Sequence, residues 1–148
     1  GARAAARARY LVTGGTGFLG QHLVAQLAAQ HHEVRVLARG PPGEGLPSGV
    51  EVVAGSVADA AAVEAAMAGV DGVWHLAGRV RHSRLGDGGD GEGAIDAMRS
   101  INVDGTLNVV RAAAAAGVRR VVYASTSGCV AVGGAGAAAA EDGAPYAD

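Results

Sequence analysis

Three glycines near the start of the chain have the spacing of a phosphate-binding turn. They lie at positions 14, 17 and 20 of the segment VTGGTGFLG, which covers residues 12–20. The first glycine allows a tight turn, the second lets the backbone approach a phosphate, and the third lets a helix pack closely against a strand. The N-terminus of that helix adds free N–H groups and the positive end of its dipole. The segment predicts an anion site, and a flexible loop without a ligand is the alternative.

The elements expected around these glycines favour a dinucleotide as the anion. An apolar run at residues 9–13 predicts a buried strand, and the helical spacing of apolar residues predicts a helix over 18–30. A second predicted strand, 33–38, ends about 20 residues further on, as a dinucleotide-binding unit requires. No Gly-Lys-Ser/Thr follows, which excludes a Walker-type loop. The residues of this segment expected to contact the dinucleotide are Gly14, Thr16, Gly17, Phe18, Leu19 and Gly20.

The end of the second strand predicts which dinucleotide is preferred. An acidic side chain there would hydrogen-bond the ribose hydroxyls of NAD, but this chain has Ala38 followed by Arg39. A carboxylate repels a 2′-phosphate, whereas a guanidinium binds it with two hydrogen bonds. We therefore expect NADP(H) to be favoured over NAD(H), with Arg39 as the discriminating residue. A surface arginine beside a loop is the alternative.

The rest of the chain alternates between predicted strands and helices. Strands are expected at 50–54, 71–76 and 120–125, and helices at 59–68 and 94–116. Asp59 is the expected N-cap of the first of these helices, and Gly117 ends the second. The alternation predicts an α/β fold of the Rossmann type, a doubly wound parallel sheet with strand order 3-2-1-4-5. The 148 residues are expected to form a single domain, with 1–8 as a frayed lead-in and 134–148 as an irregular tail.

Composition and charge narrow the classes of partner. The net charge of -2 gives no electrostatic basis for binding nucleic acid or an anionic membrane. No run approaches the roughly 18 apolar residues of a membrane span. The single cysteine, Cys129, cannot form an internal disulfide and fits a reducing, cytoplasmic location. The segment DGGDGEG, residues 87–93, has the acidic residues of a calcium loop, but it occurs once, so we expect a solvated loop and no metal site.

With two residues between the first and second glycines of its pattern, TGGTGFLG resembles the cofactor loop of the extended short-chain dehydrogenases/reductases. This branch contains nucleotide-sugar epimerases and dehydratases and the dihydroflavonol-reductase-like enzymes. The segment HLAG, which begins at His75, resembles the family's HLAA. The resemblance implies that Leu76, Ala77 and Gly78 meet the nicotinamide-side ribose. His75 itself is expected to be structural, with acid/base chemistry as the alternative.

The segment after the third predicted strand departs from the family's pattern. Members often have Gly-Asp followed by an apolar residue there, and the aspartate contacts the adenine amino group. This chain has Gly55, Ser56 and Val57 instead. The resemblance implies that Ser56 hydrogen-bonds the adenine and that Val57 lies against the ring, a weaker match than the aspartate would give.

The fifth predicted strand runs into YASTSGCVAVG, which resembles the family segment that supplies a catalytic hydroxyl. In the family this hydroxyl hydrogen-bonds the substrate carbonyl or alcohol while hydride moves to or from nicotinamide. The resemblance implies Thr126 in this role, with Ser127 as the alternative one residue later, or a hydroxyl-rich turn that satisfies its own backbone. INVDGTLNVV, residues 101–110, resembles the family's NVxGTxN and implies that Asn102 lines the active site. A structural tie to a neighbouring backbone is the alternative for Asn102.

The family completes its chemistry with Tyr-x-x-x-Lys, in which the lysine lowers the tyrosine pKa. All 12 basic residues of this chain are arginine, so that pair is not present. We expect the cofactor-binding part of a reductase, epimerase or dehydratase of a small-molecule substrate, inactive alone. The resemblance covers the N-terminal part of the family, which favours a fragment; a non-catalytic dinucleotide-binding or sensing module is the alternative. Apolar surface uncovered by the missing part predicts self-association.

Overall fold

The computed structural model of the chain describes residues 7–41, 45–79 and 92–125. The two candidate hydroxyl residues, Thr126 and Ser127, lie outside the described residues. The same holds for the predicted tail at 134–148, for Cys129, for most of the predicted lead-in and for most of the segment considered for calcium. Within the described ranges, no helix has both the length and the apolar character that a membrane crossing requires.

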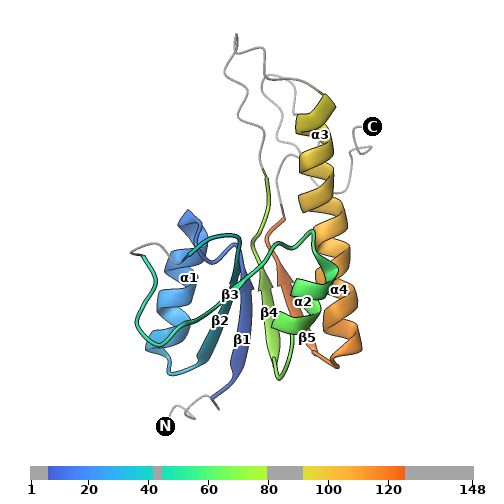
Figure 1. Cartoon of the computed structure of the whole chain (residues 1–148). Helices are drawn as coiled ribbons and strands as arrows, with labels where there is room; N and C mark the ends of the chain where they lie inside the picture. Colours follow the sequence, from blue (N-terminus) through green and yellow to red (C-terminus); the bar gives the residue numbers. More distant parts are fainter. Residues whose placement is uncertain (1–6, 42–44, 80–91, 126–148) are drawn as a thin grey trace, which may run out of the picture.

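Five parallel strands form one sheet in the order β3-β2-β1-β4-β5 (Figure 1), which confirms the predicted topology. The strands are β1 (Arg9–Thr13), β2 (Glu33–Ala38), β3 (Glu51–Ala54), β4 (Gly72–His75) and β5 (Arg120–Tyr123). β1 is central, and the strand order reverses beside it, because β2 and β3 extend to one side and β4 and β5 to the other. In a sheet of this kind, the crevice at the carboxyl ends of the two strands that flank the reversal is the usual ligand site.

Helices cover both faces of the sheet. Figure 1 shows α1 (Phe18–Ala29) on one side and α2 (Ala60–Ala66) and α4 (Gly105–Ala115) on the other. Successive side chains of a strand point to opposite faces, so Leu11 of β1 packs in the cluster of α2 and α4, whereas Val12 packs in the cluster of α1. Both side chains are fully buried, and each such burial contributes about 1.5–3 kcal/mol. The two layers therefore fix the central strand and the loop that leaves it.

Apart from its first residue, β2 is buried on both faces, including the charged residue Arg35. The alternation in EVRVLA predicted the strand correctly, but it did not predict that residues 34–38 would all be buried. The Arg35 guanidinium donates hydrogen bonds of 2.8 Å to the carbonyls of Ala66 and Ala68 and one of 2.9 Å to the Glu51 carboxylate. Arg35 thus satisfies carbonyls at the C-terminal end of α2, where a cation is favoured.

The prediction of one uninterrupted helix over 94–116 is wrong in one respect, because a π-helical turn divides it. α3 (Glu92–Arg99) runs into the π turn η1 (Ser100–Asp104), and α4 follows without a break. At the end of η1 the N–H of Gly105 donates to the carbonyl of Ser100, five residues earlier. One extra residue in a turn shifts the phase of the helix but leaves its apolar composition unchanged, so periodicity does not reveal it. Such turns occur frequently at functional sites.

Both predicted helix caps are confirmed. The Asp59 carboxylate accepts hydrogen bonds from the N–H groups of Ala61 and Ala62 at 3.0 and 3.2 Å. Gly117 follows α4 with a φ of 71°, a left-handed conformation that glycine adopts without a steric penalty. The ends of α2 and α4 are therefore set by local sequence.

Candidate functional site

The loop after β1 forms the predicted glycine turn. Gly14 has a φ of 72°, and its carbonyl accepts a hydrogen bond from the N–H of Gly17 at 3.0 Å. A Cβ at Gly14 would lie 2.7 Å from the backbone nitrogen of Ala77, so the turn and the segment after β4 touch through their backbones. A Cβ at Gly20 would overlap the Gly14 carbonyl oxygen. Gly20 therefore allows α1 to pack on the turn itself, a contact even closer than the helix–strand packing predicted.

One glycine of this turn was missed by the sequence argument. Gly15 is buried, and a Cβ there would lie 2.8 Å from Cγ1 of Val36 in β2. Its place in the segment GG was visible, but the neighbour that requires it lies on another strand. The turn thus depends on glycine for its conformation at Gly14 and for close packing at Gly15 and Gly20.

The first turn of α1 presents backbone rather than side chains to the loop. Gly17 is its N-cap, with no side-chain hydrogen bond to the helix, so the first N–H groups are left for a ligand. Phe18 and Leu19 are 85% and 59% exposed. They, like Gly20, are not among the described residues that line the cleft, and their contacts with a dinucleotide stay predictions.

A cleft of about 490 Å³ opens at the carboxyl ends of the strands, a volume within the usual range for a ligand site. It lies where the strand order reverses, as the fold predicts. Of the residues predicted to bind the dinucleotide, nine line it: Gly14, Thr16, Gly17, Arg39, Ser56, Val57, Leu76, Ala77 and Gly78. The sequence argument did not select five others that line it: Leu37, Ala38, Gly55, Arg79 and Ile101. Leu37, Ala38, Gly55 and Arg79 lie within two residues of residues predicted to bind the dinucleotide, whereas Ile101 comes from η1 and precedes Asn102.

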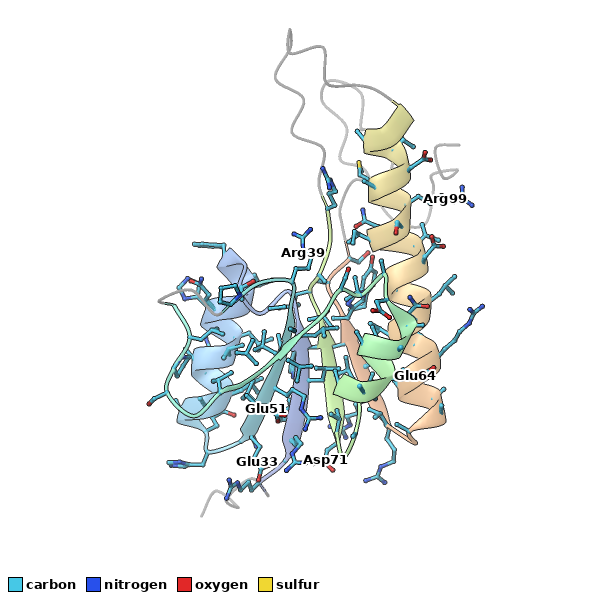
Figure 2. All side chains as sticks on the ribbon, viewed as in Figure 1. Glu33, Arg39, Glu51, Glu64, Asp71 and Arg99 are labelled. Atoms are coloured by element: carbon cyan, nitrogen blue, oxygen red, sulfur yellow. The ribbon has the colours of Figure 1, made fainter. Side chains whose placement is uncertain are left out.

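The charges around the cleft favour an anion. Two arginines, Arg39 and Arg79, line it, and no carboxylate does so among the residues that the structure describes. Figure 2 shows Arg39 at the carboxyl end of the sheet, whereas Glu33, Glu51 and Asp71 lie at the opposite end. The free N–H groups of α1 add a further positive contribution.

The wall formed after β3 is held in place by α4. Val57 is only 5% exposed, and a Cβ at Gly105 would lie 2.7 Å from its Cγ2, so helix and wall are in close contact. The side-chain amide of Asn108 donates to the Val57 carbonyl at 3.0 Å. Ser56 accepts a hydrogen bond of 3.3 Å from the N–H of Ala58, which leaves its own hydroxyl proton for another partner. Gly105 and Asn108 were not selected from the sequence, although both lie in the segment compared with NVxGTxN.

Asn102 makes a structural tie, the alternative that the sequence left open. Its Oδ1 accepts from the N–H of Arg79 at 2.7 Å, and its Nδ2 donates to the Arg79 carbonyl at 2.9 Å. Both the oxygen and the nitrogen of the side-chain amide therefore bond to one residue of the loop after β4. Asn102 positions the edge of the cleft that Gly78 and Arg79 form.

His75 is buried at the end of β4 and does not line the cleft. Its Nδ1 lies 2.6 Å from the Thr13 hydroxyl and its Nε2 lies 2.9 Å from the Thr106 hydroxyl. The Tyr123 ring stacks on it with a centroid distance of 5.4 Å. Burial lowers the pKa of His75 below its ordinary value, which favours the neutral ring. These contacts favour the structural interpretation of His75 over a role in acid/base chemistry.

Comparison with known families and proteins agrees with this geometry. The profile of the NAD dependent epimerase/dehydratase family matches residues 10–147. The 3 beta-hydroxysteroid dehydrogenase/Delta 5-->4-isomerase of Mycobacterium tuberculosis is 36% identical over 144 residues, which are 95% of this chain and 37% of that protein.

Two solved structures share the fold and were obtained with a dinucleotide. A short-chain dehydrogenase/reductase superfamily protein from Agrobacterium tumefaciens with bound NAD is 36% identical, with a TM-score of 0.69 over 82% of this chain and 33% of that chain. The UDP-glucose 4-epimerase of Thermus thermophilus, in complex with NAD, is 31% identical, with a TM-score of 0.74 over 90% of this chain and 43% of that chain. The chain thus spans less than half the length of each of these three proteins.

Proposed function

We propose that this chain, which belongs to the NAD-dependent epimerase/dehydratase family, is the dinucleotide-binding part of an extended short-chain oxidoreductase or epimerase. The observation that carries the proposal is the cleft at the carboxyl ends of the strands. Its floor is the glycine turn of Gly14 and Gly17 at the N-terminus of α1, and its edges carry Arg39 and Arg79. This combination suits a ligand with several phosphates and a flat ring at each end.

The residues present fit such a ligand. A pyrophosphate needs N–H donors and a backbone that approaches without an intervening side chain, and any Cβ at Gly14 or Gly20 would disrupt the turn that provides them. When bound, the dinucleotide supplies or accepts a hydride at its nicotinamide. The chain's own residues bind and orient it: the backbone of the turn meets the phosphates, Val57 limits access of water at the adenine side, and Ala77 and Gly78 allow close approach of the nicotinamide-side ribose.

The chain favours NADP(H) over NAD(H) in this proposal. Ala38 is buried where a carboxylate would hold the ribose hydroxyls, and the exposed Arg39 follows it at the rim of the cleft. The absence of a carboxylate from the described lining removes the group that would repel a 2′-phosphate. The two solved structures described above hold NAD, so the preference for NADP(H) rests on residues of this chain, Arg39 and the missing carboxylate, and is directly testable.

Titration calorimetry with NADPH and NADH tests both parts of the proposal. We expect NADPH to bind more tightly, and Arg39→Ala to weaken NADPH by roughly tenfold, the equivalent of about 1.4 kcal/mol for an exposed charged hydrogen bond. NADH should be unaffected. Arg111→Ala is the matched control, because Arg111 is an exposed arginine of α4 outside the cleft lining and its loss changes the net charge equally. Equal dissociation constants for the two dinucleotides would contradict the NADP preference, and no binding of either would contradict the function.

We also propose that the chain binds the dinucleotide without turning it over. The acid/base pair Tyr-x-x-x-Lys requires a lysine, and the chain contains none. Absorbance at the reduced nicotinamide band should stay constant when carbonyl substrates of short-chain reductases are added to the chain and NADPH. Steady oxidation of NADPH that depends on the added carbonyl would refute this part of the proposal and leave the binding part intact.

A further inference from the structure

A series of hydrogen bonds, buried at Thr13 and His75 and partly buried at Thr106, connects the end of β1 beside the glycine turn to the π turn. It runs from the Thr13 hydroxyl to His75, from His75 to the Thr106 hydroxyl, and from there to the backbone carbonyl of Asn102, with separations of 2.6, 2.9 and 2.7 Å. Thr13 and His75 are 0% and 1% exposed. Thr13 and His75 are the last residues of β1 and β4, and Thr106 lies at the start of α4.

The direction of each hydrogen bond follows from the donors available. The Asn102 carbonyl can only accept, so the Thr106 hydroxyl gives its proton to it and must accept from Nε2–H of His75. At the other end, the Thr13 hydroxyl accepts from the N–H of Ala77 at 3.3 Å and is free to donate to Nδ1 of His75. These assignments leave His75 neutral, with its proton on Nε2. Every polar group in this series of hydrogen bonds then has a partner.

Both ends of this series of hydrogen bonds adjoin the cleft. Thr13 immediately precedes Gly14 of the glycine turn, and it also holds the N–H of Ala77 in the segment after β4. The side-chain amide of Asn102 makes two hydrogen bonds to the backbone of Arg79, and the backbone carbonyl of Asn102 accepts from the Thr106 hydroxyl. His75 therefore joins two walls of the cleft that belong to different loops.

We propose that His75 is a positioning residue, which holds the glycine turn and the Arg79 segment in fixed relation and so sets dinucleotide affinity without touching the dinucleotide. The inference rests on the proposed function for its ligand. A purely apolar residue would fill the same space but would leave the hydroxyls of Thr13 and Thr106 without the partner that orients them. The walls of the cleft would then be packed but no longer aligned.

Paired substitutions separate alignment from simple stability. Thr106→Val removes the hydroxyl at nearly constant size, and Thr106→Ser keeps it. His75→Leu removes both ring nitrogens, whereas His75→Gln retains an acceptor and a donor on one side chain. We expect Thr106→Val and His75→Leu to raise the dissociation constant of whichever dinucleotide the wild type binds by roughly tenfold, and Thr106→Ser and His75→Gln to stay within about threefold.

Two NMR readouts follow the mechanism directly. The ring of His75 should show a protonated Nε2 and an unprotonated Nδ1 in the wild type. Hydrogen exchange at the Arg79 amide should accelerate in Thr106→Val, because Asn102 then lies on a loosened turn, whereas exchange at the amide of Met67, the C-cap of α2, should not change. A general loss of stability would accelerate both amides.

The outcomes distinguish this inference from the function on which it rests. A wild-type chain that binds neither NADPH nor NADH overturns the proposed function and the inference with it. A wild type that binds, with equal affinity in Thr106→Val and Thr106→Ser, overturns the inference alone. If His75→Leu does not fold, the Thr106 pair decides the matter, since that residue is only partly buried on α4.

Discussion

Replacing Gly20 by alanine should weaken both the fold and dinucleotide binding. A Cβ at this position would overlap the Gly14 carbonyl oxygen and lie 2.6 Å from Cα of Gly15. These atoms belong to the backbone, so no side chain can rotate away, and either α1 or the turn must move. Overpacking costs about 1–3 kcal/mol, and rigid backbone neighbours place this case at the upper end. Alanine regains about 1 kcal/mol of helix propensity, which leaves an expected net loss of about 2 kcal/mol.

Gly93 in α3 provides the matched control, because a Cβ there meets nothing within 4 Å. Gly93→Ala should be neutral or stabilising by about 0.5–1 kcal/mol. Circular dichroism gives both values from urea unfolding, and the melting temperature of Gly20→Ala should fall by roughly 4–8 °C. Its dissociation constant for NADPH should rise by roughly tenfold, since the displaced turn carries the N–H groups that we propose as the phosphate donors. Wild-type stability and affinity in Gly20→Ala would refute the steric account of the turn.

Three further predictions concern stability. Arg35→Met should cost about 2–3 kcal/mol in urea unfolding, because the carbonyls of Ala66 and Ala68 lose a charged donor; an unchanged midpoint would show that water replaces it. Asp59→Ala should cost about 1 kcal/mol through loss of the N-cap, and Asp59→Asn should retain most of it. Burial lowers the pKa of His75 below 6.5, so the unfolded chain takes up its proton first. The stability that neutral His75 provides should be complete above pH 6.5 and fall as the pH drops through the folded-state pKa. The free energy of unfolding, measured against pH, should show this fall in the wild type and not in His75→Gln.

The sequence predicted the sheet well because its strands are set by local patterns. Alternating strand and helix segments together with the handedness of crossovers leave few strand orders, and the observed order is the one expected. The glycine turn was equally accessible, since the spacing of Gly14, Gly17 and Gly20 reflects constraints within one short segment. Asp59 and Gly117 belong to the same class, because a cap depends on residues within one turn.

What the sequence did not predict involves partners distant along the chain. Gly15 is required by Val36, and Gly105 by Val57, and neither contact has a local pattern. In the sequence, Arg35 has the position of an exposed residue in an alternating strand. Its burial depends on the carbonyls at the end of α2, which lie about 30 residues further along the chain. The π turn escapes for another reason, since one added residue leaves the apolar content of α3 and α4 intact. Thr126 and Ser127 stay predictions, because they lie outside the described residues.

Side chains of the π turn and of α4 hold the loops that border the cleft. Asn102 holds the loop after β4, Asn108 holds the loop after β3, and Thr106 reaches the turn after β1 through His75. Loops that follow three strands thus contact one continuous helical segment, through side chains that lie within about two turns of it. Because the described ties to these walls come from within residues 13–108, we expect dinucleotide affinity to be set by the residues of this chain, without a substrate-binding region. We therefore expect dinucleotide binding to be measurable on this chain separately from turnover, even though the chain contains no lysine.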